Sequence, residues 1–280
     1  MEQFNIPEHY DVMADLDRDV HDDIELSRSE AALAVSLIQE STGSIPRSVF
    51  LPCFGTGRHI VPLFKLGVKK ITGVDLSATC IKKALTHLTR LNGGNIVQLT
   101  LADLRSWYTN EEFDAVLLLG NSFADIIDPS QLTLFTAGML RSLKSGGVFV
   151  MDYIGERYLE RCRTARQSTW HAVLNGVPVL DCRVPKYDSE HRVLQIDVRV
   201  EALETHELVW TGFYQKLILT PTELIQRFGA RSVELQHIGL ADELNPYYSA
   251  VDSKHPLHAI HGGDLGMLQE SDWWVGRKMK

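Results

Sequence analysis

The sequence contains little cysteine, no surplus of basic residues and no long apolar run. Its 4 cysteines show no C-x-x-C spacing, so neither a zinc knuckle nor a disulfide framework is indicated. The 28 basic residues are outnumbered by 36 acidic ones, and the net charge of -8 argues against nucleic acid as the main partner, because phosphate contacts need clustered lysine and arginine. No apolar run reaches membrane-spanning length, and the N-terminus lacks a basic region followed by an apolar stretch. We therefore expect a cytoplasmic protein with no nucleic-acid or membrane partner, and the oligomeric state stays open.

The glycine loop of the chain lacks one glycine of the dinucleotide-binding pattern. The apolar run 49–52 leads into Gly55 and Gly57 and then into a helix expected over 58–66. Glycine allows a tight turn and a close approach of the backbone to a ligand, and a helix N-terminus offers unpaired N–H groups to an anion. Ile60 stands where the dinucleotide-binding pattern G-x-G-x-x-G has its third glycine. The loop therefore favours a ligand without the phosphates of NAD(P), although an NAD(P) oxidoreductase stays open as an alternative.

Acidic residues follow the next two apolar runs. Asp75 ends the first of them, eighteen residues after Gly57, close to the position at which an acid holds a ribose diol in nucleoside-binding folds. Asp103 follows the second, 96–101. Because the carboxyl ends of parallel strands share one edge of a sheet, we expect the glycine loop and both acids to meet there. This pattern predicts an adenosine-containing cofactor.

Apolar runs alternate with amphipathic segments through the first half of the chain. This alternation predicts an α/β fold with an open, mostly parallel Rossmann-like sheet and helices on both faces. The expected strands are 49–53, 70–75, 96–101, 113–119 and 147–153, and the expected helices are 58–66, 77–91 and 130–143.

The texture changes after Tyr153, and residues 168–219 are rich in β-formers. Four β-rich runs follow one another, and Asn175-Gly176 lies between the first two, as a hairpin turn requires, which predicts an inserted antiparallel β meander. Thr220 then begins a capping-box helix, and two late strands, 232–239 and 272–279, complete the main sheet. The expected segments are an N-terminal arm with a capping helix (1–48), a cofactor-binding core (49–165), the insertion (166–220) and the end of the core sheet with an aromatic and histidine-rich loop (221–280).

The order of these motifs is similar to that of one enzyme family. The segments LPCFGTGRH, GVDLS, LADL, FDAVLLLGNSF and LKSGGVFVMDY, spread over residues 26–160, resemble the class I S-adenosylmethionine-dependent methyltransferases. Within that family, the GNSF turn at 120–123 is similar to the glycine and sarcosine N-methyltransferase group, which places an antiparallel meander over its active site. The resemblance implies an enzyme that binds S-adenosylmethionine and methylates a small molecule.

The N-terminal arm is strongly acidic over residues 1–25 but also carries Tyr10. In the resembled family such an arm folds over the cofactor and brings a tyrosine near the sulfonium, a role that falls to Tyr10. Ser27 and Glu30 fit a capping box, so a helix is expected to begin there. Arg28 in its first turn is unfavourable for the helix dipole. The resemblance gives Arg28 another role, pairing with the methionine carboxylate.

The cofactor loop departs from the family pattern, which favours an acid near Leu51 and a glycine near Cys53. These two differences leave a non-catalytic cofactor-binding protein as an alternative. The predicted cofactor-binding residues are Tyr10, Arg28, Cys53, Gly55, Gly57, Asp75, Leu76, Asp103, Leu104 and Leu119.

The acceptor side is expected at the GNSF turn. In the resembled family its carbonyls and asparagine contact the substrate, which gives Gly120 and Asn121 as substrate-binding residues, with Phe123 as a wall. Arg157 is the candidate substitute for the arginine with which that group grips a carboxylate. The arginine that grips the carboxylate of glycine in that group is replaced here by Ile154. We therefore expect a small amine without such a carboxylate, in an acidic and aromatic pocket built by the arm and the C-terminal segment. The predicted catalytic residues are Asn121 and Tyr10, and O- or C-methylation of a small metabolite is the alternative.

Three histidines, His255, His258 and His261, recur every third residue near the C-terminus. Imidazoles at this spacing can share a metal ion, but Pro256 interrupts any long helix and no acidic or cysteine partner has a fixed spacing. Pocket lining and plain surface are the alternatives, and we expect no metal.

Overall fold

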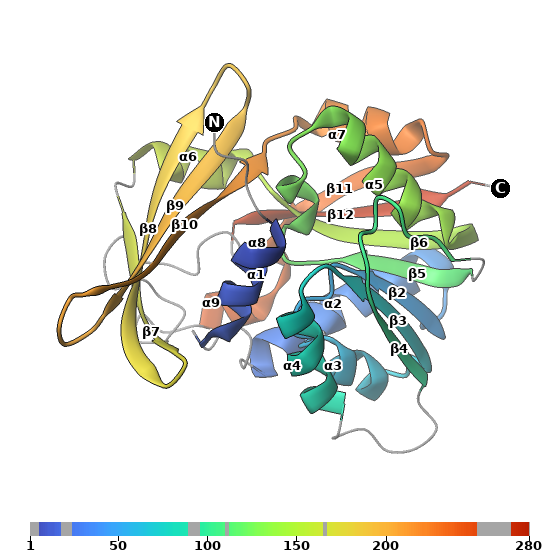
Figure 1. Ribbon diagram of the computed structural model, residues 1–280. Helices are drawn as coiled ribbons and strands as arrows, with labels where there is room; N and C mark the ends of the chain where they lie inside the picture. The colour runs from blue at the N-terminus through green and yellow to red at the C-terminus, as the bar shows by residue number, and fades with distance from the viewer. Residues whose placement is uncertain are drawn as a thin grey trace.

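The computed structural model describes residues 6–17, 24–88, 96–109, 112–164, 167–250 and 270–279, which form two sheets (Figure 1). The larger sheet has the strand order β11-β12-β6-β5-β2-β3-β4; β6 to β4 run parallel, and β11 and β12 pair antiparallel. The predicted open, mostly parallel sheet is therefore confirmed. Its strands are β2 (Ser48–Pro52), β3 (Lys70–Asp75), β4 (Ile96–Leu101), β5 (Phe113–Leu118), β6 (Leu143–Ile154), β11 (Val233–Leu240) and β12 (Ser271–Lys278).

Helices cover both faces of this sheet, as the apolar central strands require, because strands of a parallel sheet are buried on both sides. On one face α5 and α7 pack over aromatic side chains, and the rings of Phe149 and Phe228 stack with centroids 4.9 Å apart. On the other face α2, α3 and α4 cover a second apolar cluster that includes Val49 and Ile71. These helices are α2 (Ile24–Thr42), α3 (Ile60–Lys65), α4 (Ala78–Leu88), α5 (Pro129–Arg141) and α7 (Pro221–Gly229).

The smaller sheet is the predicted insertion, with one strand added from the N-terminal arm. Its order is β1-β7-β8-β9-β10, all antiparallel. Asn175 (φ 52°) and Gly176 (φ 81°) both adopt positive φ between β7 and β8, as the expected two-residue hairpin turn requires. The strands are β1 (Leu16–Asp17), β7 (Ser168–Leu174), β8 (Val177–Asp188), β9 (Val193–Ala202) and β10 (Leu208–Leu217).

The arm helix α1 (Ile6–Asp15) lies between the two sheets in Figure 1. The arm is attached to the core through Asp11 and to the insertion sheet through Leu16. The Asp11 carboxylate accepts from the Ser77 hydroxyl at 2.5 Å and from the Thr79 N–H at 3.2 Å, and Leu16 pairs with Leu174 in the insertion sheet. The arm therefore bridges the core and the insertion. The remaining short helices are η1 (Ser122–Asp125), α6 (Glu156–Thr164), α8 (Ala241–Leu244) and α9 (Pro246–Ala250).

Of the two predicted capping boxes, one is present and one is wrong. Thr220 caps α7, its hydroxyl accepting from the Glu223 N–H while the Glu223 side chain accepts from the Thr220 N–H. Helix α2, by contrast, begins at Ile24, so Ser27 lies inside it. Glu30 is turned into the protein instead, where it meets buried partners from elsewhere in the chain. Within the described part of the chain, no helix combines the length and apolar character needed to cross a membrane.

Candidate active site

A cavity of about 310 Å³ lies at the carboxyl ends of the parallel strands, where the strand order reverses between β5 and β2. The arm helix, the strand ends and the insertion sheet all contribute to its wall. Most of the predicted site residues meet there, although they come from distant parts of the chain. Those on the wall are Tyr10, Cys53, Gly55, Gly57, Asp75, Leu76, Asp103, Leu104, Leu119, Gly120 and Asn121.

The glycine loop has the backbone that its sequence predicts. Gly55 (φ 58°) and Gly57 (φ 75°) both lie in the left-handed region. A Cβ on Gly57 would lie 2.8 Å from the Cβ of Ala84, so only glycine allows α4 to pack this closely, whereas the same position on Gly55 faces open space. Cys53 also has positive φ (52°), in keeping with the glycine found near this place in the resembled family. Burial raises the pKa of its thiol well above the usual range, so the Cys53 side chain is a neutral part of the wall.

Asp75 is held by the loop that it faces. Its carboxylate accepts from the Gly55 N–H at 2.8 Å and from the Ser77 N–H at 2.9 Å. Burial raises its pKa, and these backbone hydrogen bonds oppose the shift. The second acid, Asp103, is half-buried and binds Arg105 through both carboxylate oxygens, which lowers its pKa. Both carboxylates are thus fixed along one side of the cavity, at the ends of β3 and β4.

A buried ionic cluster around Glu30 lies next to the glycine loop. The guanidinium of Arg58, which lines the cavity, is 2.5 Å from the Glu30 carboxylate. Glu30 also contacts the His59 ring at 2.8 Å and accepts from the Tyr248 hydroxyl at 2.9 Å. Although burial raises the pKa of Glu30, Arg58 and His59 outweigh it and bring it down to about 2. Arg58 is not among the residues predicted from the sequence, where its only signal is its place directly after Gly57.

Arg28, in contrast, is not on the cavity wall. Its side chain is 48% exposed and pairs with Glu25 one turn earlier in the same helix. This position gives no support to the expected pairing with a methionine carboxylate, which stays a prediction. Arg58 is the guanidinium that the fold brings to the cavity beside the glycine loop.

The two arginines can be separated by ligand binding. We expect Arg58→Lys, which keeps the charge beside Glu30 but loses the planar fork, to weaken S-adenosylhomocysteine binding by roughly tenfold. Binding of 5′-methylthioadenosine, which lacks the amino acid part, should change little. Arg28→Ala should affect neither ligand. Calorimetric titration measures both, and a selective loss of S-adenosylhomocysteine affinity in Arg28→Ala alone would restore the original assignment.

A second ionic cluster lies where the core, the arm and the insertion meet. The Tyr10 hydroxyl donates to one oxygen of Asp125 at 2.5 Å, and the Lys216 ammonium lies 2.6 Å from the other. Lys216 also donates to the Asn121 carbonyl at 3.2 Å. Asp125 and Lys216 line the cavity and are almost fully buried. Neither residue is predicted from the sequence, because their meeting depends on the contact between β10 and η1.

The insertion sheet supplies an aromatic and cationic wall. Arg183 lies over the rings of Trp170 and Tyr214, at 5.5 and 5.6 Å from their centroids, and its guanidinium binds the buried Asp181. The ring of His9 packs 4.9 Å from that of Tyr214; burial and the nearby cations lower the His9 pKa to about 3, so it is neutral. The arm therefore adds aromatic and apolar groups to the wall. Asp11 of the arm binds Ser77 and Thr79 and does not line the cavity, whose acids come from the core. The expected acidic pocket of arm and C-terminal segment stays a prediction.

The GNSF turn is fixed by an acid from the neighbouring strand. Asp152 accepts from the Gly120 N–H at 3.0 Å and from the Asn121 N–H at 2.9 Å. Asn121 has positive φ (59°), and its side-chain amide donates to the Ser271 hydroxyl at 3.1 Å. Burial raises the Asp152 pKa to about 6. The backbone carbonyl of Asn121, and not its side chain, therefore faces the cluster of Lys216 and Asp125.

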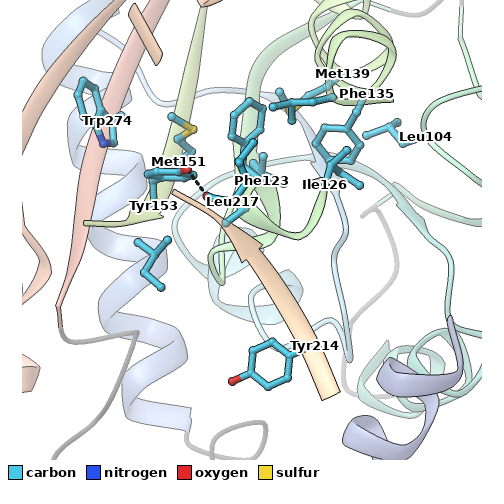
Figure 2. Close-up of a cluster of buried hydrophobic side chains, with 14 of the residues drawn as sticks. Leu104, Phe123, Ile126, Phe135, Met139, Met151, Tyr153, Tyr214, Leu217 and Trp274 are labelled. Carbon is cyan, nitrogen blue, oxygen red and sulfur yellow. Dashed lines mark hydrogen bonds between the residues drawn. The ribbon is translucent and has the colours of Figure 1, made fainter. Parts of the chain in front are cut away.

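Two predicted substrate contacts are not on the wall. Phe123 is 1% exposed and packs among Phe135, Tyr153 and Phe228, on the core side of the turn (Figure 2). Phe123 and Asp125 lie in the same 3-10 turn but point in different directions. Phe123 packs into the apolar core, whereas Asp125 lines the cavity. Arg157 pairs with Asp242 at 2.8 Å and does not line the cavity. The positions of Phe123 and Arg157 therefore give no support to the expected substrate contacts, which stay predictions.

The three histidines of the C-terminal loop lie outside the described residues. Elsewhere, among the residues that the structure describes, no group of three or more histidine, cysteine or acidic side chains is arranged to hold a metal ion. All four cysteines are free.

Known proteins resemble this chain in two ways. Residues 52–147 match the methyltransferase domain family. A glycine/sarcosine N-methyltransferase from Aphanothece halophytica is 31% identical over 100 residues, which is 35% of this chain and 37% of that protein. The chain thus spans little more than a third of the length of this relative in the match.

Solved structures resemble the chain over most of its length. SAM-bound CalS10, an amino pentose methyltransferase from Micromonospora echinaspora, has a TM-score of 0.63 at 17% identity and covers 90% of this chain and 92% of its own. The sugar N-methyltransferase KedS8 from Streptoalloteichus sp ATCC 53650 has a TM-score of 0.64 at 18% identity, with 90% of this chain and 87% of its own covered. At these identities the likeness establishes the fold.

Proposed function

We propose that this chain, which contains a class I S-adenosylmethionine-dependent methyltransferase domain, methylates a nitrogen of a small-molecule amine. The observation that carries the proposal is the continuity of one cavity. It runs from the glycine loop and Asp75, past Tyr10 and Asp125, to the aromatic wall of the insertion.

The residues of the first half fit S-adenosylmethionine. The space beside Gly55 admits a ligand against the backbone, and the carboxylate of Asp75 matches a ribose diol. Asp103 and Leu104 would lie beside the adenine, and Arg58 would hold the methionine carboxylate. When bound, S-adenosylmethionine supplies a methyl group activated by the positive charge on its sulfur.

The task of the protein in such a transfer is to position the acceptor and exclude water. Holding reactants in the right geometry can lower a barrier by ~7–11 kcal/mol. Three parts of the chain surround the place where the two halves of the cavity meet: Tyr10 of the arm, Leu119 and the Asn121 backbone carbonyl of the core, and the insertion sheet. Asn121 acts here through its carbonyl, as an acceptor for an N–H of the substrate.

A nitrogen acceptor without a glycine-like carboxylate fits the second half of the cavity. The cationic side chains of this wall each pair with an acid already: Lys216 with Asp125, Arg183 with Asp181, and Arg161 with Glu270. A substrate carboxylate would bring a second negative charge to a cation that an acid already neutralises, whereas an amine needs only the acceptor oxygens nearby. The names of the relatives above, glycine/sarcosine and sugar N-methyltransferases, support nitrogen as the acceptor atom.

The test is methyl transfer from labelled S-adenosylmethionine to a panel of acceptors: propylamine, ethanolamine, D-glucosamine, glycine, sarcosine, phenol and acetate. We expect turnover of one or more of the three carboxylate-free amines, because a deprotonated nitrogen has the lone pair that attacks the methyl group. Transfer to phenol without any amine activity, or efficient transfer to glycine or sarcosine, would contradict the proposal.

A further inference from the structure

The cluster around Asp125 does more than hold the fold together. We propose that Asp125 is a catalytic residue, the proton acceptor for the substrate ammonium, and that Lys216 and Tyr10 position it; this inference rests on the proposed amine methylation. Asp125 is the acid that lines the cavity at the junction of the cofactor half and the insertion half.

The geometry leaves Asp125 able to accept a further hydrogen bond. An ionised carboxylate has about four acceptor positions on its two oxygens. Tyr10 uses one position at 2.5 Å and Lys216 uses one at 2.6 Å. Because Asp125 lines the cavity, its remaining acceptor positions are available to a substrate. The backbone carbonyl of Asn121 is close by, since Lys216 contacts both groups. An ammonium at this place meets two oxygen acceptors at once.

The surrounding charges favour proton transfer from the ammonium. Lys216 provides a positive charge beside Asp125, and a like charge disfavours the protonated form of an amine that enters next to it. Burial raises the pKa of Asp125 even though Lys216 and the Tyr10 hydroxyl oppose the shift, and the raised pKa makes its carboxylate a stronger base than an exposed one. The other titratable groups that face Asp125 are Tyr10 from α1 and Cys53 from the loop after β2, and burial raises both of their pKa values well above the usual range. Both therefore stay neutral near pH 7.

The proposed step balances as follows. The substrate ammonium gives one proton to an Asp125 oxygen, which leaves a neutral amine with a lone pair. The lone pair forms the new N–C bond as the S–C bond breaks, and the sulfur keeps that electron pair. The product is the methylated ammonium, and the Asp125 proton passes to solvent when the site opens.

The experiment compares pH profiles of kcat/KM for the amine of the panel that the wild-type protein methylates fastest. In Asp125→Asn we expect kcat/KM to fall by ~10²–10⁴-fold near pH 7. Below the pKa of the free amine, the variant should lose about tenfold per pH unit, because it depends on amine already deprotonated in solution. The wild-type profile should stay flat there. Asp125→Glu, which keeps a carboxylate, should recover part of the rate and the flat profile.

A purely structural role predicts a different pattern. It would lower the whole Asp125→Asn profile in parallel with the wild type, and that result would overturn the inference. Because Asp125→Asn leaves Lys216 buried without its acid, the double variant Asp125→Asn/Lys216→Met is measured alongside, and S-adenosylhomocysteine affinity reports whether each variant is folded. The double variant should bind S-adenosylhomocysteine within about twofold of the wild type and still show the tenfold dependence. A wild-type protein that binds S-adenosylhomocysteine but methylates no amine would defeat the proposed function itself, whereas parallel profiles with active wild type defeat only the role of Asp125.

Discussion

Replacing Asp75 with alanine is expected to weaken S-adenosylhomocysteine binding roughly 10- to 100-fold. A hydrogen bond to a charged group contributes ~1.5–3 kcal/mol, and each 1.4 kcal/mol is about a factor of ten in affinity. Asp75 is nearly fixed before any ligand binds, because Gly55 and Ser77 hold its carboxylate from the backbone. Little ordering is then needed on binding, so its interaction with a ribose diol should contribute close to its full value. Isothermal titration of the folded variant measures the loss.

The variant also removes two backbone hydrogen bonds, and a matched control separates that effect. Asp114 likewise accepts from two backbone N–H groups, those of Arg47 and Ser48, both at 2.9 Å, but it does not line the cavity. Asp114→Ala should loosen its own turn and leave the affinity for S-adenosylhomocysteine unchanged. Equal losses in the two variants would mean that Asp75 acts only through the backbone, and an unchanged affinity in Asp75→Ala would remove it from the site.

The second large effect concerns stability. Glu30→Gln is expected to destabilise the folded protein by roughly 3 kcal/mol at pH 7, because it leaves the guanidinium of Arg58 buried without its acid. The pKa of Glu30 is about 2 in the folded protein against 4.5 ordinarily, and each unit corresponds to ~1.4 kcal/mol. A folded pKa below the unfolded one gives stability that is present above pH 4.5 and is lost as the pH falls toward 2. The difference in unfolding free energy between the wild type and Glu30→Gln should therefore shrink over that range.

Urea unfolding at several pH values between 2 and 7 checks this expectation. Glu223 is the matched control, since its pKa is also lowered to about 2 by an arginine, Arg192, but it is partly exposed. Solvent screens that pair, so Glu223→Gln should cost much less, of the order of 1 kcal/mol or below. Glu30→Gln/Arg58→Met should recover part of the lost stability. A Glu30→Gln loss no larger than that of Glu223→Gln, at every pH, would contradict the account of the buried cluster.

The sequence alone determined the fold class and the cofactor loop, because both depend on local signals. Apolar strands that alternate with amphipathic helices can be buried only as a sheet covered on both faces. Gly57 and Asn175-Gly176 adopt the positive φ that the turn patterns around them predict, so the loop and the hairpin can be predicted without the structure. The carboxyl ends of parallel strands meet at one edge, which is why Asp75 and Asp103 were predicted together.

Tertiary structure decided what side chains do once several partners compete for them. The two capping-box patterns show this: Glu223 stays local and caps its helix, whereas Glu30 is taken by Arg58, His59 and Tyr248 from distant segments. No local pattern encodes those partners, because they meet only after the sheet has formed. The same reason explains the remaining differences. Phe123 and Asp125 are two residues apart in one turn, and only the position of the core and of Lys216 on β10 sends the first into the interior and the second to the cavity wall.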